Sequence, residues 1–278
     1  MENNVCYINY NGLLDALFEN WMGTLDEEQK KLFCKDGLII IPDKKENPEY
    51  VNEKWEHSPR RVMFILKDKN TPDGDDIRRW LIDEKNGENN RNLFGGIVGK
   101  GCLPNIAKIL YGLLTAEKDK RPNFDSVTNN MDDVRKFWNS KPFALIEAKK
   151  IAGFSTVSKK EIEYAINRDE IFLKKEIDIL KPNIIVCCGA DDTQFRFITE
   201  KYMNGKKHLE FGDKNFPDSK RPGCLWYYPE DQIAVIKSYH PTSRGKYNPS
   251  WKVFERVISP FGGLMKDINP LGFRIEKE

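Results

Sequence analysis

Four short apolar segments constrain the fold of this 278-residue chain more than any other feature of its sequence. Each is rich in β-branched or aromatic residues and lies between polar or turn residues; they span residues 61–66, 143–146, 183–188 and 233–236. Their apolar residues run continuously and do not alternate with polar ones, which is typical of strands buried on both faces of a parallel sheet. The pattern therefore predicts four central strands.

Helical periodicity fills most of the intervals between these strands. Apolar residues recur at helical spacing near the start of the chain and in residues 25–33, 76–82, 105–114, 132–138 and 159–180. Residues 37–42 are expected to form a short strand or an extended arm. Strands that alternate with helices indicate an α/β protein, and we predict a three-layer α/β/α sandwich with a small central parallel four-stranded sheet.

No internal repeat or low-complexity linker divides the chain. We expect residues 1–58 to form an N-terminal helical extension packed on the core, and residues 59–278 to form the α/β domain. Within the extension, Trp21 and Trp55 are expected to serve as core or interface residues.

Composition excludes several classes of protein. With 39% hydrophobic and 32% charged residues, the chain can build a core, so intrinsic disorder is excluded. No apolar run approaches the roughly 20 residues that span a bilayer, and the first residues lack the pattern of a signal peptide. We therefore expect a cytoplasmic protein without a membrane partner. The six cysteines form no CxxC pair, which disfavours a disulfide framework or a metal site.

Ligands of parallel α/β sheets bind at the carboxyl ends of the strands, so the residues that follow each strand are the first candidates for a site. Asp68 lies two residues beyond the first strand, where its carboxylate can position water or stabilise a developing cation. The alternative is that Asp68 is solvated, while Asp73, Asp75 and Asp76 cap the next helix.

His240 follows the fourth strand and precedes Pro241. Proline restricts the backbone of the residue before it to extended conformations, so the imidazole is held at the carboxyl end of this strand. Such a histidine can donate to a leaving group near neutral pH. The alternative is a structural histidine that is hydrogen-bonded to the backbone of the loop.

These features together resemble the uracil-DNA glycosylase superfamily: an acidic loop after the first strand, Pro182 before the third, and His240-Pro-Thr-Ser243 after the last. The resemblance covers about residues 60–260 and is strongest in the final motif. It implies a uracil-DNA glycosylase-like fold for residues 59–278. It also implies that the protein flips a damaged or modified base out of single- or double-stranded DNA and excises it by hydrolysing the N-glycosidic bond.

The resemblance also assigns roles by position. Residues 66–69 stand where the family carries Gly-x-Asp-Pro, so Asp68 would orient water or stabilise the sugar cation, although the glycine and the proline are absent. His240 would hydrogen-bond the departing base and stabilise its negative charge. Thr242 and Ser243 would contact phosphate, and Arg244 or Tyr247 would enter the space left by the flipped base.

Three further residues are assigned to substrate binding. Lys67 and Asn70 flank Asp68 in the first loop. Phe94 falls where the family places an aromatic residue that stacks on the extruded base, and a core role for it is an equal alternative. The family's iron–sulfur members carry a close CxxC pair that this chain lacks, so we expect no cluster and no other cofactor.

Glu147 marks a departure from the family pattern. Many members end the second strand with an asparagine that reads the edge of uracil, and this chain has Glu147 there. An asparagine side chain both donates and accepts hydrogen bonds, whereas an ionised glutamate only accepts. If Glu147 lines the pocket, it selects a base edge that presents donors, such as the amino group of a cytosine-type base or a purine, or it is itself protonated.

Two other functions stay open at this level. The altered first and second motifs favour a nucleic-acid-binding or nucleotide-binding module that has kept the fold and lost catalysis. The other open function is an unrelated α/β hydrolase or transferase that acts on a small molecule. A serine hydrolase is disfavoured because the chain has no G-x-S-x-G motif, and a cysteine nucleophile is disfavoured because Cys187 and Cys188 lie in a predicted strand.

Overall fold

The computed structural model describes residues 7–39, 47–69, 74–81, 102–153, 157–189, 192–212, 224–242 and 249–274. The helices of this part of the chain are α1 (Tyr10–Met22), α2 (Glu27–Lys31), α3 (Pro48–Glu56), α4 (Ile77–Trp80), α5 (Cys102–Thr115), α6 (Phe124–Thr128), α7 (Met131–Ser140), α8 (Lys159–Leu180), α9 (Thr193–Arg196) and α10 (Ser250–Asp267). A π-helical segment, Phe197–Tyr202, follows α9, and a short 3-10 helix, Leu271–Phe273, follows α10.

The described strands form one sheet in the order β1-β3-β2-β4-β7-β6-β5. Their bounds are β1 (Gly37–Leu38), β2 (Val62–Asp68), β3 (Ala144–Lys149), β4 (Ile184–Cys188), β5 (Leu209–Phe211), β6 (Cys224–Tyr228) and β7 (Ile233–Ser238). The central strands β3, β2, β4 and β7 are parallel, and they are the four segments that the continuous apolar runs predict.

The sheet is larger than the predicted four strands. β1 pairs antiparallel with β3 at one edge, whereas β6 and β5 extend the other edge antiparallel to β7. β5 is only three residues long and its first two residues are exposed, so it lacks the continuous apolar run by which the central strands are recognised. The four expected parallel strands therefore form the centre of the sheet, but the described sheet is mixed and has more strands than expected.

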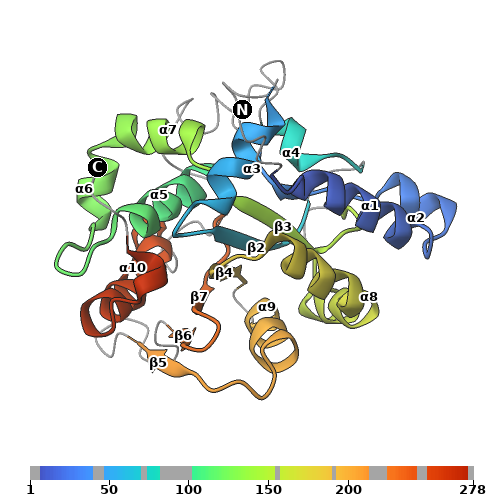
Figure 1. The fold of residues 1–278 in the computed structure, drawn as a ribbon. Helices are drawn as coiled ribbons and strands as arrows, with labels where there is room; N and C mark the ends of the chain where they lie inside the picture. Colours follow the sequence, from blue (N-terminus) through green and yellow to red (C-terminus); the bar gives the residue numbers. More distant parts are fainter. Residues whose placement is uncertain are drawn as a thin grey trace, which may run out of the picture.

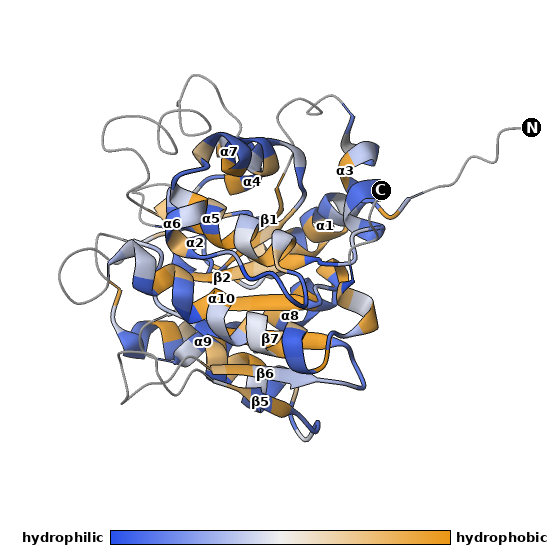
Figure 2. Ribbon diagram, turned by 90° about the vertical axis from the view of Figure 1, so that its left-hand side faces the viewer, coloured by the Kyte–Doolittle hydropathy of each residue, from blue (hydrophilic) through white to orange (hydrophobic). Residues whose placement is uncertain are grey.

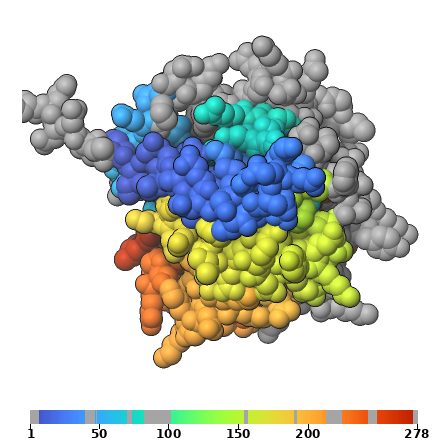
Figure 3. Space-filling model, turned by 90° about the vertical axis from the view of Figure 1, so that its right-hand side faces the viewer, coloured from blue at the N-terminus to red at the C-terminus, as the bar shows by residue number. Residues whose placement is uncertain are grey.

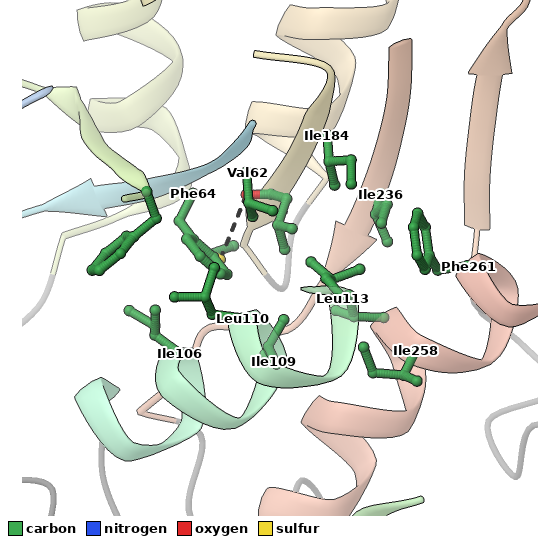
Figure 4. Close-up of a cluster of buried hydrophobic side chains, with 14 of the residues drawn as sticks. Val62, Phe64, Ile106, Ile109, Leu110, Leu113, Ile184, Ile236, Ile258 and Phe261 are labelled. Atoms are coloured by element: carbon green, nitrogen blue, oxygen red, sulfur yellow. Dashed lines mark hydrogen bonds between the residues drawn. The ribbon is translucent and has the colours of Figure 1, made fainter. Parts of the chain in front are cut away.

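Helices cover both faces of this α/β sheet (Figure 1). On one face, α5 and α10 pack on the strands; Figure 4 shows the contact between Val62, Phe64, Ile184 and Ile236 of the sheet and Ile106, Ile109, Leu110, Leu113, Ile258 and Phe261 of the two helices. On the other face lie α1 and α8. Figure 2 shows the central strands in the orange of hydrophobic residues between these layers.

The N-terminal helix α1 lies against α8, as the adjoining blue and yellow-green surfaces in Figure 3 show. Trp21 of α1 is fully buried and stacks on Phe172 of α8, with ring centroids 5.0 Å apart. Trp55 of α3 is also fully buried, and its indole N–H donates to the backbone oxygen of Leu180 at 2.8 Å. Both tryptophans therefore serve the core.

Helix α8 begins and ends where local chemistry sets its limits. Ser158 and Glu161 form a capping box at its start, and Lys181 adopts a left-handed conformation just before Pro182 at its end. None of the helices in the described ranges is both long enough and apolar enough to cross a membrane.

Candidate functional site at the carboxyl edge of the sheet

The strand order creates a switch point between β2 and β4. From β2 the chain moves to β3 on one side, whereas β4 lies on the other side of β2. Connections leave in opposite directions at such a point, which opens a crevice beyond the carboxyl ends of the strands. Asp68 ends β2, Glu147 lies near the end of β3, and His240 follows β7, so the fold brings these three predicted residues to one edge.

Asp68 lies at the end of β2 opposite Lys149 of β3. Its side chain is only 8% exposed, and its Oδ2 lies 3.5 Å from the Lys149 ammonium. Burial raises the pKa of Asp68, although Lys149 and Lys67 act in the opposite direction. A Cβ on Gly153 would come within 2.6 Å of the Asp68 carboxylate, so the loop after β3 approaches it closely. The Asp68 carboxylate is therefore buried beside Lys149 and is not solvated.

The nearby acidic residues have structural partners. Asp76 caps α4 by accepting a hydrogen bond from the backbone N–H of Arg78 at 3.1 Å. Asp75 pairs with the buried Lys69 at 2.7 Å, and this lysine also lies over the Trp80 ring. Asp76 therefore caps α4, as the alternative interpretation predicts, whereas Asp75 pairs with Lys69 and Asp73 lies outside the described residues. Asp68 takes no part in the cap.

His240 has a defined tautomer. The backbone N–H of Thr242 donates to Nδ1 at 3.2 Å, and the Thr242 hydroxyl lies 2.6 Å from the same nitrogen. An amide N–H can only donate, so Nδ1 is the acceptor and the proton of the neutral ring is on Nε2. Burial and then the charge of Lys67 lower the pKa of His240 to about 4. The imidazole is neutral at pH 7 and offers an Nε2–H donor.

The residues on either side of His240 are anchored by helices. Asn105 of α5 donates through Nδ2 to the backbone oxygen of Pro241 at 2.7 Å. Arg256 of α10 donates to the hydroxyl of Tyr239 at 3.1 Å and lies over its ring. These contacts hold the histidine loop against the sheet. The sequence reasoning missed both partners, although a polar Asn105 at a buried position of an apolar helix is a signal that could have identified it.

Glu147 is 2% exposed, and its backbone N–H donates to Asp36 Oδ2 at 2.7 Å. Burial, and then the nearby Asp36, raise the pKa of Glu147 well above its usual range, against the opposing effect of Lys150. Its Oε2 is buried and has no hydrogen-bond partner among the residues that the structure describes. Of the two states considered for this side chain, the neutral acid is favoured, and a neutral acid both donates and accepts.

A buried ion cluster lies directly behind Glu147. The Lys150 ammonium contacts Asp36 at 2.6 Å and Glu176 of α8 at 2.8 Å, and all three side chains are fully buried. The cluster ties the end of β3 to α8. Sequence reasoning missed Asp36 and Glu176. Glu176 lies on the apolar face of α8, between Leu173 and Leu180, and a charge at such a position is the available signal.

Two cavities lie near this edge. One, of about 320 Å³, is lined by Lys149, the partner of Asp68, together with residues of α8 that include Tyr164 and Arg168. The other, of about 210 Å³, lies between α8 and the α9 region. Neither is lined by Asp68, Glu147 or His240. In the described ranges, no group of three or more His, Cys, Asp or Glu side chains is arranged to hold a metal ion.

The predicted site residues thus divide into two sets. The structure places Lys67, Asp68, Glu147, His240 and Thr242 at the carboxyl edge of the sheet. The others lie outside the described residues, and their roles stay predictions: Asn70, Phe94, Ser243, Arg244 and Tyr247.

Comparison with protein-family models and with curated proteins finds no match. The function therefore has to be argued from the geometry of this edge.

Proposed function

We propose that this protein is a DNA glycosylase-like enzyme, which flips a damaged or modified nucleotide and hydrolyses its N-glycosidic bond. The observation that carries the proposal is the neutral His240, whose Nε2–H is held as a donor at the same sheet edge as Asp68. The order of the parallel strands is compatible with the proposed uracil-DNA glycosylase-like fold, in which the substrate lies across the carboxyl ends.

The two side chains match the two charges that develop during this reaction. As the bond between C1′ and the base nitrogen breaks, its electron pair leaves with the base, and the sugar becomes an oxocarbenium-like cation. His240 stabilises the departing base through its Nε2–H donor, and the Asp68 carboxylate stabilises the cation and orients water. The water oxygen then bonds to C1′, and its released proton neutralises the base.

The neutral state of His240 defines its chemical part in this mechanism. With a pKa of about 4, the imidazole does not protonate the leaving group near pH 7. It acts as a fixed hydrogen-bond donor whose contact strengthens as negative charge collects on the base, so it favours the transition state over the ground state. Lys67, which lies near both His240 and Asp68, adds a positive charge for the nucleotide.

One observation favours a second candidate, a binding module on the same fold. The Lys149 ammonium lies against the Asp68 carboxylate and diminishes the negative charge that the sugar cation would need. A protein in which this ion pair persists would bind a nucleotide without releasing its base.

Purified protein incubated with single-stranded and duplex oligonucleotides distinguishes these candidates. The oligonucleotides carry uracil, hypoxanthine, xanthine or a modified cytosine, and abasic sites are then detected by alkaline cleavage. Base release that is lost in Asp68→Asn and His240→Ala supports the glycosylase. Binding without release, with an affinity that falls steeply as salt rises, supports the binding module. If the protein neither releases a base nor binds the oligonucleotides, both candidates are overturned and a small-molecule substrate is indicated.

A further inference from the structure

The cavity of about 320 Å³ beside the candidate site is formed by three elements of the fold. Lys149 at the end of β3, Ile151 just beyond it and the first turns of α8 line the cavity, and Gln29 of α2 completes the lining. On this side of the molecule the blue surface of α1 and α2 adjoins the yellow-green surface of α8 (Figure 3). A cavity of this size suits one small molecule.

The residues that α8 contributes share one side of the helix. Lys160, Tyr164 and Arg168 follow one another at intervals of four, which aligns them along the helix axis. Tyr164 is a large aromatic residue that is 68% exposed. Its ring, with Ile151 and Ala165, supplies the apolar part of the lining. A planar base can stack on such a ring, and this stacking tolerates any base.

Positive charge predominates in the lining. Three cationic side chains line the cavity with only one carboxylate, that of Glu161: Lys149, Lys160 and Arg168. Glu161 Oε2 accepts a hydrogen bond from the backbone N–H of Ser158 at 2.7 Å, as part of the capping box of α8. The cavity therefore favours an anion, and phosphate is an anion that lysine and arginine bind well.

Two of these cations keep donors for such an anion. Arg168 donates to Asp169 through Nε at 2.8 Å and through Nη2 at 2.6 Å, which uses two of its five N–H donors. Lys159 pairs with Glu163 at 3.4 Å, whereas Lys160 makes no ion pair among the residues that the structure describes. Both cations can therefore bind an anion without losing a partner.

Lys149 connects the cavity to Asp68. Its ammonium lies 3.5 Å from Asp68 Oδ2 and donates to the backbone oxygen of Ile151 at 2.6 Å. A Cβ on Gly153 would come within 2.9 Å of this ammonium and 2.6 Å of the Asp68 carboxylate, so the loop after β3 packs against both groups. Because the ion pair with Asp68 is long, an anion in the cavity can compete for the ammonium.

We propose that this cavity binds a nucleotide through its phosphate and its planar base, and that the bound phosphate takes the Lys149 ammonium from Asp68. The phosphate lies among Lys149, Lys160 and Arg168, and the base stacks on Tyr164. The phosphate belongs either to a free nucleotide or to the 5′ end of a DNA strand.

The effect on Asp68 rests on the proposed function, in which this carboxylate stabilises the sugar cation. While Lys149 is paired with Asp68, the protein is in the form that binds a nucleotide without releasing its base. The phosphate restores the full negative charge of Asp68, so the cavity regulates base release.

Calorimetric titration of the full chain measures each part of this ligand. The probes are adenosine 5′-monophosphate (AMP), adenosine, ribose 5-phosphate and inorganic phosphate. We expect AMP to bind about tenfold or more tightly than each of the other three, because each lacks the base or the phosphate. The proposal is overturned if AMP does not bind, or if one of the other probes binds as tightly.

Substitutions on α8 locate the binding in this cavity. Lys160→Met and Arg168→Met are each expected to weaken AMP binding about fivefold to tenfold, and Tyr164→Ala about tenfold. Lys175→Met, at another exposed position of α8, is the matched control and leaves the affinity unchanged. Thermal unfolding verifies that each variant is folded. An unchanged affinity in Lys160→Met and Tyr164→Ala would overturn the site.

The connection to Asp68 is tested by the same titration, without catalysis. Asp68→Asn removes the carboxylate that competes for Lys149, so this variant is expected to bind AMP about threefold to tenfold more tightly than the parent. Lys149→Met loses about tenfold or more. Equal affinities of Asp68→Asn and the parent would contradict the connection.

The base-release assay distinguishes the two sources of the phosphate. If a free nucleotide occupies the cavity, AMP accelerates base release by the parent and has no effect on Lys160→Met. If the end of a strand occupies it, oligonucleotides with a 5′-phosphate react faster than those with a 5′-hydroxyl. Base release that responds to neither change would contradict the regulation of Asp68.

The nucleotide site and the proposed function can fail separately. Binding of AMP through Lys160 and Tyr164, with no base release from any oligonucleotide, would establish the site and contradict the glycosylase. Base release that depends on Asp68 and His240, from a protein that does not bind AMP, would contradict the site and support the glycosylase.

Discussion

The backbone N–H of Thr242 donates to Nδ1 of His240 at 3.2 Å, and the Thr242 hydroxyl lies 2.6 Å from the same nitrogen. Thr242, two positions further along the loop, therefore sets which ring nitrogen of His240 acts as a donor. The first role of Thr242 is to orient His240, and the phosphate contact predicted for it is a separate role that remains to be tested.

We predict that Thr242→Val slows base release about tenfold, because the hydroxyl that steadies the imidazole is lost while the backbone N–H remains. Single-turnover kinetics on the substrate identified by the oligonucleotide panel measure this effect. Thr128→Val, at the exposed end of α6, is the control and leaves the rate unchanged. If the Thr242→Val variant releases the base as fast as the parent, the Thr242 hydroxyl does not contribute to positioning His240.

The folding stability of the parent protein is predicted to fall in acid because of His240. Its pKa is lowered from 6.5 to about 4 in the folded protein, so the unfolded state binds the proton first as the pH falls. Between about pH 6.5 and pH 4 the parent loses up to about 3 kcal/mol relative to His240→Gln. Urea unfolding at several pH values measures the difference. The exposed His57→Gln serves as the control, and parallel curves for parent and His240→Gln would contradict the prediction.

Glu147 is predicted to act on stability in the opposite direction. Its folded pKa lies well above the ordinary 4.5, so the folded state holds a proton that the unfolded state has released. The contribution of Glu147 to the stability of the parent therefore falls as the pH rises above about 4.5, and Glu147→Gln removes this contribution to the pH dependence. Unfolding of both proteins between pH 5 and 8 tests this, with the surface variant Glu163→Gln for comparison. A stability difference that is the same at every pH would mean that Glu147 is ionised.

The buried cluster behind β3 yields a prediction about stability alone. Lys150→Met leaves Asp36 and Glu176 buried without their cation, so we expect a loss of about 3 to 5 kcal/mol in the free energy of unfolding. Replacing the whole cluster, as Asp36→Asn, Lys150→Met and Glu176→Gln together, recovers most of this loss. Chemical denaturation measures both, and a triple variant as unstable as the single one would show that the charges themselves stabilise the fold.

The centre of the fold could be predicted because strands buried on both faces leave a continuous apolar run. Strand β5 leaves no such run, because its first two residues are exposed. Strand β6 does carry a short apolar and aromatic run, Cys224–Tyr228, but it was not among the predicted strands. Helix α10 was missed as well, and Pro260 in its interior is the kind of residue that signals a helix end.

The positions of Asp68, Glu147 and His240 at one edge could also be predicted, since parallel strands end on the same side. The ion pair of Asp68 and the protonation state of Glu147 could not be predicted from the sequence. The ion pair of Asp68 with Lys149 depends on the register of two strands that lie far apart in the sequence. The neutral form of Glu147 depends on its burial and on Asp36, a residue more than a hundred positions away.

The most direct test of the account compares single-turnover base release by the parent, Asp68→Asn and His240→Ala across pH 5 to 8. We predict release by the parent, a loss of about 10² to 10³-fold in each variant, and no change of the parent rate that follows protonation of His240 within this range. Release that survives both substitutions, or a rate that follows a group titrating near pH 6.5, would contradict the assignment of a neutral His240 and Asp68 as the catalytic pair.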